Sequence, residues 1–203
     1  MNNIHFFIAC EDQLAKALCL KLISYALPNA TYNDPIITGG CGELRKKIKP
    51  FLKIAEQDGY ATLILTDLDQ IENAEQLKIE WLEKNKAPRR FFLHVSVREA
   101  ESWVLADIDG FSNWASILKC KIPKNSDQEL NPKEKLLSIF KKYSKSEFKQ
   151  DILPRSSSQK MKVGIGYNAR LVDFVVNHWC IEKASLNSKS LSDSIQDLKK
   201  LIF

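Results

Sequence analysis

Three carboxylic acids stand where two predicted strands end. Glu11 follows the apolar run Ile4–Cys10, and Asp67 and Asp69 follow the run Tyr60–Thr66, which is rich in apolar and β-branched residues. Apolar runs of this length bounded by charge are typical of buried parallel strands, and the carboxyl ends of such strands meet at one edge of a sheet. Because carboxylate oxygens are the ligands that Mg²⁺ and Mn²⁺ prefer, we predict a divalent-metal site built from these three acids.

The spacing of Asp67 and Asp69 allows two interpretations. Residues two apart in a strand point to the same side, so both carboxylates could chelate one cation if the extended backbone continues through Leu68. An Asp-x-Asp sequence after a strand can instead cap the next helix or shape a turn. Glu11 favours the metal, because like charges that crowd together cost free energy unless a cation or protons neutralise them.

A second acidic group follows the predicted strand Arg90–Val97. Glu99 and Glu101 are candidate metal ligands and Glu99 is also a candidate catalytic residue, although acids in this place can simply favour the dipole at a helix start. Side chains two apart on a helix do not share a face, so we expect only one of the two to reach the site. Arg98 is expected to pair with these carboxylates, and contact with a substrate phosphate is the alternative.

Two lysines are candidates for substrate binding. Lys160 and Lys162 precede the Gly164-Ile165-Gly166 turn and could bring positive charge to a scissile phosphate, although solvated loop lysines are the more common case. No Gly-x-x-x-x-Gly-Lys-Ser/Thr motif occurs, which disfavours an ATPase, and no Cys-x-x-Cys or paired histidine spacing indicates zinc.

Composition limits the class of protein. The chain has 203 residues, a net charge of +5 and 44% hydrophobic residues, with no apolar run near the roughly 20 residues of a membrane span. The five scattered cysteines do not form a disulfide pattern, and the apolar run after Met1 is too short for a signal peptide. We therefore expect a cytoplasmic protein that does not enter a membrane.

The elements that must position the acids alternate along the first half of the chain. Predicted strands are Ile4–Cys10, Ile36–Thr38, Tyr60–Thr66 and Arg90–Val97, and the helices between them are Gln13–Leu27, Glu43–Gln57 and Glu75–Lys84. Only helical patterns follow: Glu99–Leu105, Phe111–Leu118, Lys133–Tyr143, Arg170–Trp179 and Leu191–Ile202. Alternation predicts an α/β domain with a mostly parallel four-stranded sheet in residues 1–107, followed by an α-helical C-terminal extension, residues 108–203, packed on it.

Basic residues surround these acids in the sequence. They cluster in Arg45–Lys53, Lys133–Lys149 and Lys160–Lys162. A cluster of acidic residues surrounded by basic ones suits a metal-dependent enzyme that acts on phosphodiesters, because carboxylates bind the metal and lysines and arginines bind the phosphates. Nucleic acid is therefore the expected partner. Alternatively, these basic clusters only form solvent-exposed faces and bind no partner.

The acids also carry a resemblance. Glu11 after a first strand and Asp67-Leu68-Asp69 after a hydrophobic strand resemble the Glu and Asp-x-Asp signature of the TOPRIM domain of topoisomerases, primases, ribosomal RNA maturases and related nucleases. The resemblance implies a TOPRIM-like Rossmannoid fold, Mg²⁺ or Mn²⁺ as cofactor, Asp67 and Asp69 as metal ligands, and Glu11 as general base or ligand. This first strand ends in Cys10-Glu11-Asp12 where many TOPRIM proteins have Glu-Gly, and Asp12 could be a further ligand or a helix cap.

A narrower resemblance extends over nearly the whole chain. Leu65–Gln70, Val97–Asp107, Asn131–Glu134 and Gly166–Asn168 are similar to segments of small bacterial TOPRIM-like proteins found beside ABC-type ATPases in predicted antiphage systems. This resemblance implies a nuclease effector with an ATPase partner. The broader TOPRIM resemblance makes Glu99 and Glu101 candidates for a second metal, as acidic residues after the corresponding strand are in its nuclease branch. The alternatives are a non-catalytic regulatory or scaffold subunit of an ATPase complex, and a phosphoryl or nucleotidyl transferase on a small substrate. The oligomeric state is left open.

Overall fold

The chain forms two compact units. The computed structural model describes residues 4–154 and 162–202. The first unit contains residues 1–97 and 192–203, and the second contains residues 98–191. The chain thus leaves the first unit after Val97 and returns to it at Ser192.

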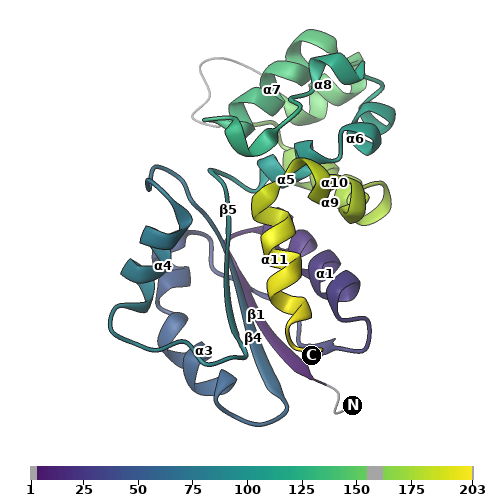
Figure 1. Ribbon diagram of the computed structural model, residues 1–203. Helices are drawn as coiled ribbons and strands as arrows, with labels where there is room; N and C mark the ends of the chain where they lie inside the picture. The colour runs from purple at the N-terminus through teal and green to yellow at the C-terminus, as the bar shows by residue number, and fades with distance from the viewer. Residues whose placement is uncertain (1–3, 155–161, 203) are drawn as a thin grey trace. The chain divides into compact units, whose positions relative to one another are not determined.

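A parallel sheet is the centre of the first unit (Figure 1). Its strands are β1 (His5–Cys10), β2 (Thr31–Tyr32), β3 (Ile36–Ile37), β4 (Tyr60–Asp67) and β5 (Phe91–Ser96). The strand order is β2-β1-β4-β5, β3 also pairs with β1, and every pair is parallel. The predicted α/β class is confirmed, and in the part of the chain that the structure describes the short strand β2 is the one strand that the sequence pattern did not predict.

Helices cover both faces of this sheet. They are α1 (Gln13–Ala26), α2 (Cys41–Arg45), α3 (Ile48–Ala55), α4 (Ala74–Leu82) and α11 (Lys189–Lys199), of which α11 belongs to this unit from Ser192 onward. Figure 1 shows α3 and α4 along one face and α1 and α11 along the other. A sheet that is buried on both faces explains why its long strands are continuous apolar runs rather than alternating ones.

The helix expected at Glu43–Gln57 is wrong as a single element. The structure has α2 and α3 instead, with a break at Lys46 and Lys47. Pro50 explains the break, because proline has no N–H to donate to the carbonyl four residues before it and tolerates only the first turn of a helix.

Alternate strand residues build the core beneath α2, α3 and α4. Ala9, Ile64 and Leu93 come from three adjacent strands and belong to one buried cluster with Phe51 and Trp81 of the helices. A slip of one residue in any strand would turn its apolar set to the other face, so this cluster helps to fix the strand register on which the position of the acids depends.

The second unit is helical. It contains α5 (Glu101–Ala106), α6 (Ile108–Ala115), α7 (Pro132–Tyr143), α8 (Ser146–Ile152), α9 (Tyr167–Asn177) and α10 (Ile181–Asn187), with the 3₁₀ turns η1 (Lys119–Lys121) and η2 (Ser126–Gln128). The sequence pattern did not predict α8 and α10, because seven residues are too few for a helical period to stand out. No helix of the described residues combines the length and apolar character needed to cross a membrane.

Aromatic side chains form the core of the second unit. Phe111, Trp114, Phe140, Phe148 and Phe174 contact one another with ring centroids between 4.8 and 6.0 Å apart. Several of these pairs are edge-to-face, a geometry that contributes beyond the burial of area. The second unit therefore has a hydrophobic core of its own.

The division of the chain differs from the one predicted from sequence, which placed the boundary after residue 107. Trp103 of α5 accepts a hydrogen bond on its carbonyl from Trp179 Nε1 (3.0 Å), so α5 belongs with the later helices. The end of the chain belongs with the sheet, because Arg89 donates a hydrogen bond to the carbonyl of Lys200 (2.9 Å). Both contacts join segments far apart in sequence, which no local pattern reveals.

A buried histidine links β5 to α11 within the first unit. His94 is 2% exposed, and its Nε2 lies 3.4 Å from Asp197 Oδ2. Burial lowers the pKa of His94, Asp197 acts in the opposite direction, and the charge of Lys78 adds to the lowering. The imidazole is therefore neutral in the folded protein at neutral pH.

This histidine should make the protein less stable in mild acid. Because the pKa of His94 is lower in the folded than in the unfolded chain, the unfolded chain takes up a proton first as the pH falls below about 6.5. The free energy of unfolding should then fall between pH 7 and 5, with a contribution from this group of at most about 1.4 kcal/mol per pH unit. Urea unfolding of wild type and His94→Gln at both pH values measures it, and an unchanged pH slope in the variant would contradict the assignment.

Candidate active site

The acids lie at the ends of neighbouring strands. Cys10 aligns with Leu65 across β1 and β4, so Glu11 and Thr66 follow next to each other. Asp67 aligns with Ser96 across β4 and β5. The parallel register therefore brings a carboxylate, a hydroxyl, a second carboxylate and a second hydroxyl to the same edge of the sheet.

This edge is also the point where the topology of the sheet reverses. After β1 the chain adds β2 and β3 on one side of β1, and it then crosses to add β4 and β5 on the other side. In open parallel sheets, the connections on the two sides of such a point run over opposite faces, and the crevice that results at the carboxyl ends is the usual place for a ligand. Glu11 and Asp67 stand on the two strands that flank it.

Glu11 is held in place by two hydrogen bonds. Its half-buried carboxylate accepts hydrogen bonds from Thr66 Oγ1 (2.7 Å) and from the backbone N–H of Asp67 (3.2 Å). Burial raises the pKa of Glu11, these two hydrogen bonds lower it in part, and the charges of Asp69 and Asp12 raise it further. Among the described residues both hydrogen bonds end on Oε1, which leaves Oε2 available to a cation.

Asp67 is oriented by the neighbouring strand. Ser96 Oγ donates a hydrogen bond to Asp67 Oδ1 (2.7 Å) and contacts the carbonyl of Thr66 (3.3 Å). Sequence reasoning missed both Thr66 and Ser96 as parts of the site. The sequence does place a hydroxyl residue at the last buried position of two predicted strands, which could have indicated a role for both. Only the pairing register of the strands shows that Thr66 bonds to Glu11 and Ser96 to Asp67.

Asp69 does not continue the strand, so the condition that the extended backbone continues through Leu68 is not met. Strand β4 ends at Asp67, and Asp69 has a left-handed backbone with φ of 49°. Leu68 is 3% exposed, and its carbonyl accepts a hydrogen bond from the N–H of Ile71 (3.1 Å), which closes a tight turn. The burial of Leu68 and this turn set the direction of Asp69, and aspartate tolerates the left-handed conformation better than most residues.

The donor set suits a hard divalent cation. Among the described residues, no group of three or more Asp, Glu, His and Cys side chains is arranged as a metal cage. Mg²⁺ does not require one, because it keeps several of its waters and binds proteins through one or two carboxylates together with substrate phosphates. Glu11 and Asp67 provide such carboxylates, and the raised pKa of Glu11 is what a nearby cation would reverse.

Asp12 is a helix cap. Its side chain accepts a hydrogen bond from the N–H of Ala15 (2.9 Å) at the start of α1. Of the two roles open to Asp12 from sequence, the structure thus gives it the cap, and its charge acts on Glu11 from a neighbouring position.

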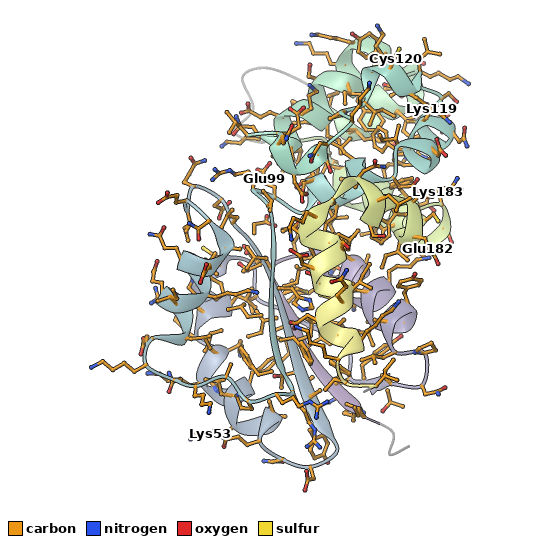
Figure 2. All side chains as sticks on the ribbon, viewed as in Figure 1. Lys53, Glu99, Lys119, Cys120, Glu182 and Lys183 are labelled. Carbon is orange, nitrogen blue, oxygen red and sulfur yellow. The ribbon has the colours of Figure 1, made fainter. Side chains whose placement is uncertain are left out.

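The other predicted site residues belong to the second unit or lie outside the described residues. Arg98 begins the second unit with φ of 64°, and Lys162 is exposed before α9. Lys160 lies outside the described residues. Glu99, labelled in Figure 2, accepts a hydrogen bond from the backbone N–H of Lys133 (2.8 Å), one of the N–H groups that the start of α7 leaves without an intrahelical acceptor.

Glu101 is part of a buried polar cluster in the second unit. It is 4% exposed, accepts a hydrogen bond from the hydroxyl of Tyr167 (2.6 Å), and lies 3.6 Å from Lys133 Nζ. Burial raises the pKa of Glu101, while Lys133 and Tyr167 lower it in part. These contacts give Glu99 and Glu101 roles inside the second unit, and their metal-binding role stays a prediction.

Glu11 should reduce stability when it is ionised. Because its folded pKa lies above its unfolded value, the stability that the protonated form contributes is complete below about pH 4.5 and is lost as the pH rises through the folded pKa. Glu11→Gln keeps an acceptor for Thr66 without the charge, so the variant should unfold at higher urea than wild type at pH 7.5 and at a similar concentration at pH 4.5. A variant that is less stable than wild type at pH 7.5 would contradict this account.

The amino-acid sequence matches a known protein family. Residues 10–163, about three quarters of the chain, match DUF4276, which is described as a domain of unknown function. The match includes Glu11, Asp67, Asp69, Glu99 and Glu101. No curated protein and no solved structure matches the chain. Because the matched residues cover most of its length, the chain belongs to the DUF4276 family.

Proposed function

We propose that this protein is a metal-dependent, TOPRIM-like nuclease that hydrolyses phosphodiester bonds with Mg²⁺ or Mn²⁺. The observation that carries the proposal is the pair Glu11 and Asp67, on the two strands that flank the topological reversal of a parallel sheet. A half-buried carboxylate with a raised pKa beside further acids is costly for the fold, and such costs are typical of functional sites.

The chemistry of the donors supports a hard cation. Glu11, Asp67 and Asp69 would hold it, and when bound it would polarise a phosphate and lower the pKa of a water nucleophile. Thr66 and Ser96 each hold one carboxylate oxygen by a hydrogen bond, so the acids keep their orientation whether or not a substrate is present. Glu11, with its raised pKa, is also suited to accept a proton from a water molecule.

The resemblance adds predictions that concern the cell rather than the site. The resemblance implies an ABC-type ATPase partner and a role in antiphage defence, and the composition implies a cytoplasmic location. Each of the three stays a prediction. Affinity purification of the tagged chain from its host, together with any ATPase encoded beside it, would identify such a partner by mass spectrometry.

Removal of the acids should abolish cleavage. Purified protein is incubated with single-stranded DNA, double-stranded DNA and total RNA in Mg²⁺, Mn²⁺ or chelator. Each reaction is run with and without any ATPase that is encoded beside this protein. Asp67→Ala/Asp69→Ala should lower the cleavage rate roughly 100-fold or more, because two cation ligands are lost. Asp34→Ala/Asp58→Ala, which removes two exposed acids that form surface ion pairs, should cleave like wild type.

The outcomes separate the candidate functions. Cleavage that needs metal and disappears only in the Asp67/Asp69 variant supports the nuclease. Absence of cleavage of every substrate, with the partner present, would overturn the proposal and favour a scaffold subunit or a transferase on a small substrate.

Thr66→Val tests whether the hydroxyl orients Glu11. It removes the hydrogen bond to Glu11 at nearly constant volume, so metal affinity or activity should fall roughly 10- to 100-fold while the far-ultraviolet circular dichroism stays the same. Thr62→Val is the matched control, since Thr62 lies on the same strand, is buried, and contacts the carbonyl of Phe51 instead. Equal loss in both variants would mean a general packing defect rather than loss of orientation.

A further inference from the structure

Positive charge is unevenly distributed between the two units. Residues 98–191 contain 16 lysines and arginines and 11 acids, while the rest of the chain contains 14 of each. The whole net charge of +5 therefore belongs to the helical second unit, and the unit that carries Glu11, Asp67 and Asp69 is neutral. An anionic partner is attracted to the second unit.

Part of this charge gathers around an exposed tyrosine. Lys121 Nζ lies 5.3 Å from the centroid of the Tyr143 ring, which brings η1 beside the end of α7. Tyr143 is 45% exposed, and Lys141, Lys142 and Lys145 next to it in sequence are exposed too. We name these five residues the lysine–tyrosine surface.

The acids near this surface are engaged elsewhere. Glu147 and Asp151 both pair with Arg170, at 3.1 and 2.7 Å. Lys119, labelled in Figure 2, pairs with Asp109 and is not part of the surface. No carboxylate of the described residues forms an ion pair with the four lysines of the lysine–tyrosine surface.

The basic helices of the first unit differ in this respect. Arg45 pairs with Glu80, Lys46 with Glu43, and Lys49 with Glu83, so acids largely neutralise that surface. Lysines in the last turn of a helix also favour its dipole, which accounts for Lys141 and Lys142 alone. It does not account for Lys121 and Lys145, nor for an exposed aromatic ring among them.

We infer that the lysine–tyrosine surface binds single-stranded nucleic acid. Lysines without acidic partners can neutralise phosphates, and an exposed ring among them can stack on an unpaired base, which a duplex does not offer. The inference deepens the proposed nuclease by naming its substrate class, and its biological meaning rests on that proposal. Binding itself requires no cleavage and can be measured with the metal removed.

The test is fluorescence anisotropy of the full chain in chelator with a labelled oligothymidylate of 20 nucleotides and a duplex of equal length. Lys141→Gln/Lys142→Gln/Lys145→Gln should weaken single-strand binding and reduce the slope of log affinity against log salt by about 2, since each phosphate contact contributes about 0.7. Tyr143→Ala should weaken single-strand binding about tenfold and leave duplex binding unchanged.

A matched control removes the same charge elsewhere. Lys53→Gln/Lys84→Gln/Lys86→Gln changes three exposed lysines of the first unit, of which Lys53 is labelled in Figure 2, and should bind like wild type. The single variant Lys121→Gln keeps the test possible if the triple variant does not fold. It should lower the slope of log affinity against log salt by about 0.7.

The inference and the proposed nuclease fail separately. Equal loss of binding in the control and in the surface variants, or no binding by wild type at low salt, would overturn the inference whatever the cleavage assay shows. Binding that follows the lysine–tyrosine surface supports it even when wild type cleaves nothing, and in that case the nuclease alone is wrong.

Discussion

The pairing of β1 with β4 is the constraint on which the site depends. Its parallel register sets Glu11 beside Thr66 and the N–H of Asp67, and the apolar residues of both strands are buried beneath helices that fix this register. A slip of one residue would expose the core and would also separate Glu11 from its donors. The same packing free energy that folds the domain thus determines the geometry of the acids.

The acids at this edge of the sheet lower the stability of the fold, and the surrounding structure must offset that loss. An ionised Glu11 is partly removed from water near other acids, and Asp69 adopts a backbone conformation that few residues favour. Thr66, Ser96 and the buried Leu68 hold these groups in place. Features that lower stability and that the neighbouring residues nevertheless enforce are a reason to look for function at this edge of the sheet.

The second unit combines its own aromatic core with a polar cluster in its interior. Glu101 meets Tyr167 and Lys133 there, and Glu99 satisfies an N–H at the start of α7. Three segments far apart in sequence meet in this cluster. The same unit holds all the net positive charge of the chain, whereas Glu11, Asp67 and Asp69 belong to the first unit.

The sequence by itself determined the α/β class, the bounds of β1, α1, β4, β5 and α7 to within one residue at each end, and the acids at strand ends, because apolar runs and charge boundaries are local properties. Strand order and the return of the last residues to the sheet were decided by tertiary structure. The break at Lys46 and Lys47 has a local cause in Pro50 that the sequence prediction overlooked, and α8 and α10 are too short for a helical period to stand out. So were the hydroxyl partners of Glu11 and Asp67 and the turn at Asp69, since each depends on which strand lies beside which and on the burial of Leu68. Contacts between segments far apart in the chain leave no periodic trace in either segment, and for that reason only the folded structure reveals them.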